Sequence, residues 1–489
     1  YDVPILYFPK FFHPDPSVKR RTGFLQPQFN NSETLGSSLH IPYFKTLGLD
    51  KDLTFKPTLF ENDKYILQNE FRKKNESSSL IADFSFLTGY KSPANAKKKN
   101  INHFFLDFKQ DLKIPNYIES KLEAQIERVS NDTYLKVFQN NLFHTPVMPE
   151  NNDIMSSNLK LVLDQDNQTL STGVEIHESL GVNHSDRYEY VFPYYDFSKD
   201  LSSIFSTSKI DGTINFYSSG TNTLSNTNNL MTKIINDIEY SSLDFISNVG
   251  LKNNLSLYFK NLNTVGKKDA VFTSSPQIDG SNIIKIDTSF PLAKFNNLAK
   301  ETLTPKISFR VNPANNMGNH SQTGSIIDAN NAFDINRLGV SESFEAGKSI
   351  TLGLDYKFDK LELNNSKESD NESKKIKDKY LEIKLATIIR DKFESNIPVS
   401  STTNRKNSNI FGSIENKLID NLNIGYTFSL DNDLETINYN SINTEISINN
   451  FVTNFDFIEE RNEIGSTHVV SNTTEYKVDD NNSIKFSTR

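Results

Sequence analysis

Residues 349–358 read SITLGLDYKF and residues 421–430 read NLNIGYTFSL, and in both stretches every second side chain is apolar. Successive side chains of a β-strand point to opposite faces, so this alternation predicts strands with one apolar and one polar face. Similar shorter alternations occur at residues 53–59, 82–86, 104–108, 159–163, 255–259 and 307–311. Turn-forming clusters of Asn, Ser, Asp and Gly separate them, which predicts an all-β chain of roughly twenty strands.

The composition is polar but rich in aromatic residues. The 489 residues include 36 Phe and 19 Tyr, which a disordered chain would lack. Only 36% of the residues are hydrophobic, and even with the 19 Gly the apolar share stays below the roughly 45–50% of a globular protein. Persistent alternation with low hydrophobicity is typical of an outer-membrane barrel, whose interior is polar and whose lipid face alone is apolar.

A soluble β-sandwich also has alternating strands, so the alternation by itself leaves that architecture open. Two further features favour a membrane barrel. The longer stretches approach the roughly 9–11 residues of a tilted membrane strand. Aromatic residues also gather near expected strand ends, as in the girdles at membrane interfaces, at Tyr43, Phe44, Phe192, Tyr194, Tyr195, Phe451, Phe455 and Phe457. We therefore predict a large antiparallel transmembrane β-barrel. Helical periodicity is limited to two short candidates, residues 117–125 and 132–139, and neither has the pattern of a full helix.

Charge and residue content exclude several classes of protein. The chain has 53 Lys and Arg against 61 Asp and Glu, a net charge of −8, which argues against a nucleic-acid binder. The absence of cysteine excludes disulfides, thiolate zinc sites and a cysteine nucleophile within these residues. The sequence contains no run of about 18 apolar residues, so it predicts no membrane-spanning helix. The chain starts at Tyr1 without a signal-peptide pattern, so we expect a fragment of a longer protein.

Motifs that would indicate an enzyme are weak. The GKS at residues 347–349 resembles the end of a phosphate-binding loop, but Glu342 replaces the required earlier glycine and a strand follows. A cluster of potential metal ligands consists of Glu175, His177, Glu178, His184 and Asp186. Its spacing matches no helical metal motif, and the chain has no GxSxG nucleophile elbow. We therefore predict no enzymatic activity, no cofactor and no metal site.

The first 45 residues carry the most specific motif. Residues 3–9 read VPILYFP, residues 14–27 read PDPSVKRRTGFLQP and residues 41–43 read IPY. This series resembles the start of the barrel in the LptD (OstA) family, the lipopolysaccharide-assembly proteins of the Gram-negative outer membrane, although Thr22 stands where that family usually has Ser. Weaker matches follow in the same order at residues 129–135, 304–307 and 333–338.

The resemblance implies a translocon that assembles lipopolysaccharide into the outer leaflet of the cell outer membrane. Residues 1–20 would end a periplasmic β-jellyroll or linker, and residues 21–489 would form the barrel, with its closing strands missing from this chain. The implied partners are lipopolysaccharide, an LptE-like plug lipoprotein, a periplasmic LptA-like bridge and outer-membrane lipid, but no nucleic acid.

The implied functional residues lie at the start of the barrel. The barrel-start motif comprises Lys19, Arg20, Arg21, Gly23 and Phe24. For its three basic residues, a solvated turn, an anchor at the periplasmic interface and attraction to anionic lipid phosphates remain alternatives.

Pro27 and Pro42 fall in the first two expected strands. Proline has no N–H for the ladder and is confined to strand edges and bulges, where it needs no further role. In the family, prolines at the matching positions weaken a seam through which lipopolysaccharide leaves sideways. We therefore expect Pro27 and Pro42 to form a lateral gate.

An alternative function is a passive outer-membrane pore or nutrient receptor on a similar barrel, which would need an open interior. A soluble or surface β-rich adhesin is a third alternative, and it predicts extraction without detergent.

Overall fold

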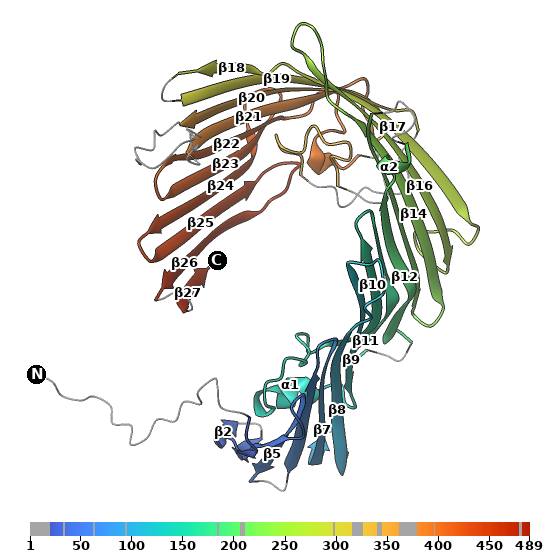
Figure 1. Cartoon of the computed structure of the whole chain (residues 1–489), viewed down its shortest axis with the longest axis vertical. Coiled ribbons are helices and arrows are strands. Elements are labelled where there is room, and N and C mark those ends of the chain that lie inside the picture. Colours follow the sequence, from blue (N-terminus) through green and yellow to red (C-terminus); the bar gives the residue numbers. More distant parts are fainter. Residues whose placement is uncertain are drawn as a thin grey trace, which may run out of the picture. The chain divides into compact units, whose positions relative to one another are not determined.

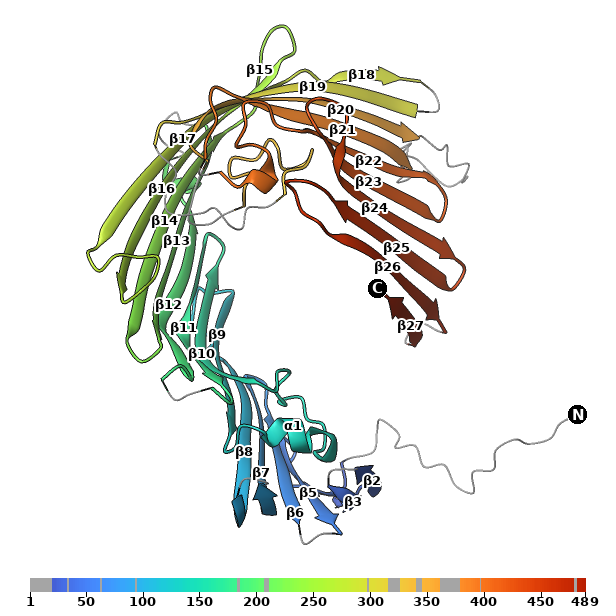
Figure 2. The same cartoon turned by 180° about the vertical axis from the view of Figure 1, so that it is seen from behind.

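The computed structural model describes residues 20–32, 35–61, 64–92, 95–182, 185–205, 211–296, 299–314, 326–339, 345–360, 379–395, 397–478 and 482–489. Figures 1 and 2 show these residues in colour, from opposite sides. They form 27 β-strands and only four short helical elements. None of the described helices is long and apolar enough to cross a membrane.

The described residues up to position 200 form twelve strands. They are β1 (Gly23–Phe24), β2 (Gln28–Ser32), β3 (Gly36–His40), β4 (Tyr43–Thr46), β5 (Lys51–Phe60), β6 (Tyr65–Lys74), β7 (Ser78–Ser92), β8 (Asn95–Asp111), β9 (Glu119–Val129), β10 (Ile154–Gln165), β11 (Gln168–Ser179) and β12 (Tyr188–Asp200). Two short helices lie between β9 and β10, namely α1 (Tyr134–Phe138) and the 3-10 helix η1 (Gln139–Asn141). The helical candidate at residues 132–139 therefore contains the short helix α1, whereas most of the candidate at residues 117–125 belongs to strand β9.

The described residues after position 200 form fifteen further strands. They are β13 (Gly212–Ser225), β14 (Asn229–Ser242), β15 (Phe245–Ile246), β16 (Lys252–Lys267), β17 (Gln277–Ser289), β18 (Leu292–Phe295), β19 (Ala299–Asn312), β20 (Gly347–Lys360), β21 (Tyr380–Arg390), β22 (Ile410–Ile419), β23 (Leu422–Leu430), β24 (Ile437–Ile448), β25 (Phe451–Glu460), β26 (His468–Lys477) and β27 (Ser483–Thr488). The helical elements are α2 (Ser202–Phe205) and the 3-10 helix η2 (Val399–Ser401).

Strand lengths separate into two groups within the described residues. Seven strands have six residues or fewer (β1, β2, β3, β4, β15, β18 and β27), and the other twenty have 9 to 17 residues. The count of long strands agrees with the roughly twenty that the alternation predicts. Of the two stretches with perfect alternation, residues 349–358 lie in β20, and all but the first residue of 421–430 form β23.

The chain divides into two compact units. The first consists of Tyr1–Phe197, Gly220–Thr232 and Gly266–Asp269, and the second of Ser198–Ser219, Lys233–Val265 and Ala270–Arg489. In the first unit, each strand from β5 to β10 pairs antiparallel with the next one in sequence. The second unit repeats this arrangement from β19 to β27.

Long antiparallel strands that pair with their neighbours in sequence form the wall of an up-and-down β-barrel. The predicted fold class, a large antiparallel all-β structure, is confirmed. One detail of the prediction is wrong, because the aromatic residues do not all mark strand ends. Phe451 begins β25, but Tyr194 and Tyr195 lie in the middle of β12.

Burial in the first unit is inverted relative to a soluble protein. Asp52 and Lys56 of β5 are only 5% and 6% exposed, whereas Leu59 of β5 and Phe86 of β7 are 53% and 55% exposed. The cross-strand register places Pro57, Leu67 and Phe86 on one face, and Lys56, Gln68 and Ser85 on the other. One face of the sheet is therefore polar and covered, and the other is apolar and exposed, as in the wall of an outer-membrane barrel.

The second unit shows the same inversion. Lys260, Lys285 and Arg310 are buried, whereas neighbouring apolar residues such as Phe259 and Ile286 are more than a third exposed. A soluble β-sandwich would bury its apolar face instead, so the inversion disfavours that alternative.

Connecting segments fold onto the polar face in each unit and form compact apolar clusters there. In the first unit, the buried side chains of Tyr134, Leu135 and Phe138 in α1 pack with Leu87 and Phe105 from the strands. Figures 1 and 2 show α1 against the sheet of the first unit. In the second unit, Ile327 and Leu338 pack against Ile388 of β21 and Phe411 of β22.

Candidate functional site at the first hairpin

Residues 23–46 form a broken hairpin, which we call the first hairpin. Its first arm consists of β1 and β2, and its second arm of β3 and β4. Gly23 and Phe24 pair with Phe44 and Tyr43, and the pairing resumes where Gln28 meets His40. Three residues on the first arm therefore face two on the second arm, an irregularity of the kind seen at β-bulges.

The two predicted gate prolines lie in these gaps rather than inside strands. Pro27 separates β1 from β2, and Pro42 separates β3 from β4. Proline cannot donate a ladder bond, which explains why each expected strand is split at its proline. Pro27 is exposed and Pro42 is buried.

The carbonyl group of Pro42 still accepts a hydrogen bond. The backbone N–H of Leu25 donates to it across the hairpin at 2.9 Å. In the hydrogen-bonded pairs of an antiparallel ladder, the two opposite residues exchange both N–H···O=C bonds. Pro42 accepts without donating in return, so this level of the hairpin lacks a bond worth about 0.5–1.5 kcal/mol.

A third proline repeats the arrangement one strand further on. Pro57 lies inside the continuous strand β5, and its carbonyl group accepts the backbone N–H of Ile41 at 3.2 Å. His40 pairs with Thr58 and Tyr43 pairs with Phe55, so the gap at Pro42 lies beside Pro57. The two arms of the first hairpin and β5 lie side by side, and each therefore lacks one backbone N–H donor at a neighbouring position of the ladder. The equal spacing of positions 27, 42 and 57 is a sequence signal that could have identified Pro57.

The structure brings most of the barrel-start motif to the same hairpin. Arg20 forms an ion pair with Asp52 of β5 at 2.6 Å. Phe24 is 75% exposed, and its ring makes an edge-to-face contact with Tyr43 at 5.0 Å between centroids. Arg21 is exposed, and Lys19 lies outside the described residues. A Cβ atom at Gly23 would meet nothing within 4 Å, so packing does not require glycine there.

Residues 130–153, which we call the inner segment, connect β9 to β10 and lie on the polar face. The hydroxyl group of Tyr134 lies 2.5 Å from Ser85 Oγ and 2.9 Å from Nδ1 of His103. The other ring nitrogen of His103 lies 2.6 Å from Asp83. All four side chains are buried, so this network fixes α1 to β7 and β8.

The inner segment also holds the first hairpin. Asn30 of β2 donates to the backbone oxygen of Asn140 at 2.9 Å, and Asn141 donates to Ser38 of β3 at 3.3 Å. Gln68 of β6 makes two hydrogen bonds with the backbone of Phe143, at 2.8 and 3.0 Å. The first hairpin is therefore tied to the middle of the first unit from its polar side.

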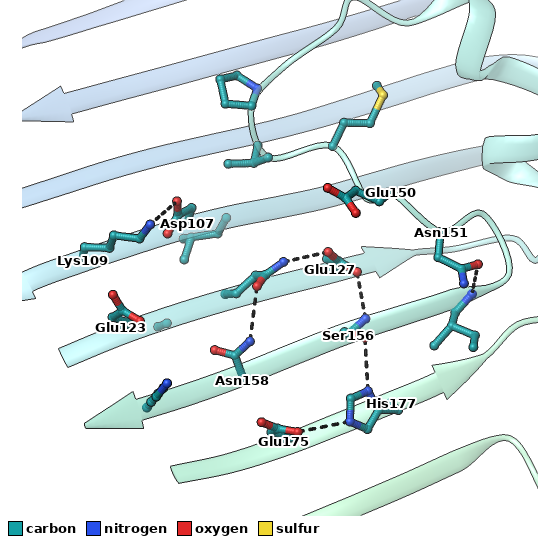
Figure 3. Close-up of a pocket in the computed structure, with 18 of the residues that line it drawn as sticks. Asp107, Lys109, Glu123, Glu127, Glu150, Asn151, Ser156, Asn158, Glu175 and His177 are labelled. Atoms are coloured by element: carbon teal, nitrogen blue, oxygen red, sulfur yellow. Dashed lines mark hydrogen bonds and ion pairs between the residues drawn. The ribbon is translucent and has the colours of Figure 1, made fainter. Parts of the chain in front are cut away.

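A cavity of about 800 Å³, which we call the acidic cavity, lies on the polar face between β8 and β12 (Figure 3). Five carboxylates and two lysines line it, namely Asp107, Glu123, Glu127, Glu150, Glu175, Lys109 and Lys160. Glu127 accepts the backbone N–H of Ser156 at 2.8 Å, and His177 lies 3.3 Å from Glu175.

Only part of the metal-ligand cluster suggested by the sequence comes together. Glu175 and His177 line the acidic cavity, but Glu178 instead forms an ion pair with Arg187 at 2.7 Å. His184 lies outside the described residues. Within the described ranges, no group of three His, Asp or Glu side chains could hold a metal ion.

The second unit has a buried charge cluster that sequence reasoning missed. Glu345 accepts hydrogen bonds from Arg337 and Arg390, and its backbone oxygen accepts from Arg310 at 2.8 Å. Arg337 also donates to Ser349 at 3.0 Å, so the GKS stretch begins strand β20 and serves this cluster. Burial would raise the pKa of Glu345, but the three guanidinium groups outweigh it and lower the pKa to about 2.

Comparison with known proteins gives a family. A model of the family LptD, described as LPS transport system D, matches residues 103–481. Proteins named LPS-assembly protein LptD are similar over shorter stretches. The one from Shewanella oneidensis is 39% identical over 71 residues, which is 14% of this chain and 9% of that protein. The one from Idiomarina loihiensis is 27% identical over 138 residues, or 28% of this chain and 17% of that protein.

A third relative of the same name, from Pseudomonas aeruginosa, is 27% identical over 142 residues, which is 28% of this chain and 14% of that protein. The matches to these three curated relatives therefore span less than a fifth of their length. The family model covers far more of the chain than any of these pairwise matches. Because it matches well over half of the residues, this chain belongs to the LptD family.

Proposed function

We propose that this chain forms the wall of an outer-membrane translocon that assembles lipopolysaccharide into the outer leaflet. Membership of a family described as an LPS transport system supports this role, and it makes the chain a transport protein rather than an enzyme. The exposed apolar face of the strands supports placement in the outer membrane, because such a face is stable against lipid and not against water.

Lipopolysaccharide leaves sideways through a seam at the first hairpin. The observation that carries this proposal is the row of Pro27, Pro42 and Pro57, where three backbone N–H donors are missing although the carbonyl groups of Pro42 and Pro57 accept hydrogen bonds. Fewer ladder bonds lower the free energy needed to part neighbouring strands. The gate is thus a property of backbone hydrogen bonding, and side-chain chemistry at these positions is secondary.

The chain enters its barrel from the periplasm. Arg20 lies at the end of the sheet where β4 joins β5 and β6 joins β7, opposite the end at which the long inner segment joins β9 to β10. Short turns face the periplasm in outer-membrane barrels. Residues 1–20 then end a periplasmic jellyroll or linker, an LptA-like bridge delivers the substrate there, and an LptE-like lipoprotein plugs the interior.

Substitution of the gate prolines tests the proposal. In the full-length protein, Pro27→Ala together with Pro42→Ala restores two ladder donors, and we expect surface lipopolysaccharide to fall severalfold at normal levels of folded barrel. Pro115→Ala, in the turn between β8 and β9, is the matched control and should leave export unchanged. Unchanged surface lipopolysaccharide in the double variant would reject the gate.

A further inference from the structure

The part of the first hairpin that lies beyond the row of three prolines consists of β2 and β3, and we call these two strands the flap. They pair with each other at five positions. Toward the rest of the sheet, the flap pairs at three positions, where Ser38–His40 meet Thr58–Phe60 of β5. The next two strands, β5 and β6, pair with each other at nine positions. The ladder therefore holds the flap much more lightly than it holds the neighbouring strands.

The flap has one apolar and one polar face. Phe29 of β2 pairs with Leu39 of β3 on the apolar face, and Phe29 is 83% exposed. Asn30 and Ser38 pair on the polar face, and both make hydrogen bonds with the inner segment, at 2.9 and 3.3 Å. The flap therefore turns its polar face to the inner segment and its apolar face away from it.

Two further contacts join the flap region to the inner segment. The ring of His40 meets the ring of Phe143 edge to face, with 5.1 Å between the centroids. Leu35, directly before β3, is 4% exposed and belongs to the same buried apolar cluster as Phe138 of α1. We call these two contacts and the two hydrogen bonds of Asn30 and Ser38 the catch. It consists of hydrogen bonds between uncharged groups and of a few ring and apolar contacts.

The opposite side of the inner segment is held by stronger contacts. Arg187 donates two hydrogen bonds to Asp132 of the segment, at 2.7 and 3.2 Å, and also pairs with Glu178 of β11 at 2.7 Å. Tyr134 is fixed to β7 and β8 by its buried hydrogen-bond network. Hydrogen bonds between charged groups are roughly twice as strong as those between neutral ones. A movement that separates the flap from the sheet therefore breaks the catch and leaves the inner segment in place.

The prolines provide a hinge for such a movement. Pro27 and Pro42 interrupt the two arms between the flap and the pair formed by β1 and β4. On the other side of this interruption, β4 pairs with β5 at four positions, Tyr43–Thr46. Hinges are a few residues at the ends of elements that absorb the change in backbone angles. The flap can therefore turn about the prolines while β4 stays paired with β5.

We propose that the catch is an autoinhibitory latch, by which the inner segment keeps the flap closed against β5. The flap must leave the inner segment before the seam opens, and the inner segment stays on β7 and β8 in both states. This inference rests on the proposed function, because the seam that the latch guards is the one proposed above.

A cross-link across the catch tests the latch in the full-length protein. These 489 residues contain no cysteine, so Asn30→Cys with Asn140→Cys supplies the only thiols in this part of the protein. We expect surface lipopolysaccharide to fall severalfold when a short, reducible bifunctional thiol reagent joins the pair, and to recover after reduction. The matched control is Gln139→Cys with Asn152→Cys, whose native side chains lie 2.7 Å apart within the inner segment. Bridging this pair with the same reagent should leave export unchanged.

Weakening the catch should have the opposite effect on the flap. Ser38 is 4% exposed, so the rate at which a thiol reagent labels Ser38→Cys in the purified full-length protein reports opening of the latch. We expect Leu35→Ala to raise this rate severalfold. Leu49→Ala, at a side chain that is 95% exposed in the connection between β4 and β5, should leave the rate unchanged. Heat-modifiable gel migration confirms that each variant is folded.

Three results would overturn the latch. One is normal export while the flap is bridged to the inner segment, and another is an equal loss of export in the bridged control pair. The third is an unchanged labelling rate in folded Leu35→Ala. Each of these rejects the latch and leaves the seam to its own proline test, whereas export that continues after depletion of the protein rejects the proposed function as well.

Discussion

Glu345 shows how a single residue holds a connecting segment to the sheet. It lies among Arg310, Arg337 and Arg390, and its side chain is almost completely buried. Removing one partner of a buried ion pair leaves uncompensated charge, which costs about 3–5 kcal/mol. We therefore expect Glu345→Gln to destabilise the folded protein by about that amount in urea unfolding in detergent micelles.

A surface carboxylate provides the control for this prediction. Glu382 pairs with Lys384 at 3.1 Å, and both side chains are a quarter exposed. Glu382→Gln should cost less than about 1 kcal/mol. Equal losses in the two variants would contradict the assigned role of the cluster.

The pH dependence of stability follows from the same residue. The pKa of Glu345 is lowered from 4.5 to about 2 in the folded state, so its stabilising contribution is fully present above pH 4.5. That contribution is lost as the pH falls from 4.5 toward 2. The acid-induced loss of stability should be smaller in Glu345→Gln than in the unmodified protein. If the stability of the two proteins depended on pH in the same way, the role given to Glu345 would be contradicted.

Sequence reasoning at the residue scale singled out Arg20, Pro27 and Pro42 because a linear motif contains them, and their roles stay predictions. It assigned no role to Pro57, Glu345 or Tyr134. The contacts of Glu345 with Arg390 and of Tyr134 with Ser85 join residues far apart in the sequence and on different elements. No local spacing encodes such contacts, since only the folded sheet brings the partners together.

At the scale of elements, the inner segment supports the first hairpin from the polar face, in addition to the pairing of β3 and β4 with β5. Gln68 binds the backbone of Phe143 twice and also donates to Asp83 at 3.0 Å. We expect Gln68→Ala to release the segment and to increase amide hydrogen exchange in β2 and β3 severalfold. Exchange in β24 and β25 of the second unit should stay unchanged. Unaltered protection of β2 and β3 would contradict the support role.

The alternation of apolar and polar residues predicted the long strands, but it did not predict the gaps that divide the arms of the first hairpin into β1 and β2 and into β3 and β4. Residues 349–358 lie within β20 and residues 422–430 form β23, because a period of two specifies a strand wherever its two faces meet different surroundings. The inner segment carries no such periodicity. Its helix α1 packs against Leu87 of β7 and Phe105 of β8, and such contacts between distant parts of the chain cannot be read from the local sequence.

At the scale of the whole molecule, exposed apolar residues opposite buried polar ones are the clearest mark of a membrane wall. Phe86 lies on the exposed apolar face of β7 and is 55% exposed. An arginine facing lipid costs about 2–4 kcal/mol near the bilayer midplane. Phe86→Arg should therefore reduce the yield of folded barrel in lipid vesicles, whereas Val271→Arg, in the connection between β16 and β17, should not. Equal yields would contradict a lipid-facing Phe86.

The measurement that tests the central claim most directly is depletion of the full-length protein in its host cell, with lipopolysaccharide scored at the cell surface. The proposed translocon predicts that surface lipopolysaccharide falls while its synthesis continues. Unchanged surface lipopolysaccharide after depletion would contradict the claim and would favour a passive pore or nutrient receptor on the same strands.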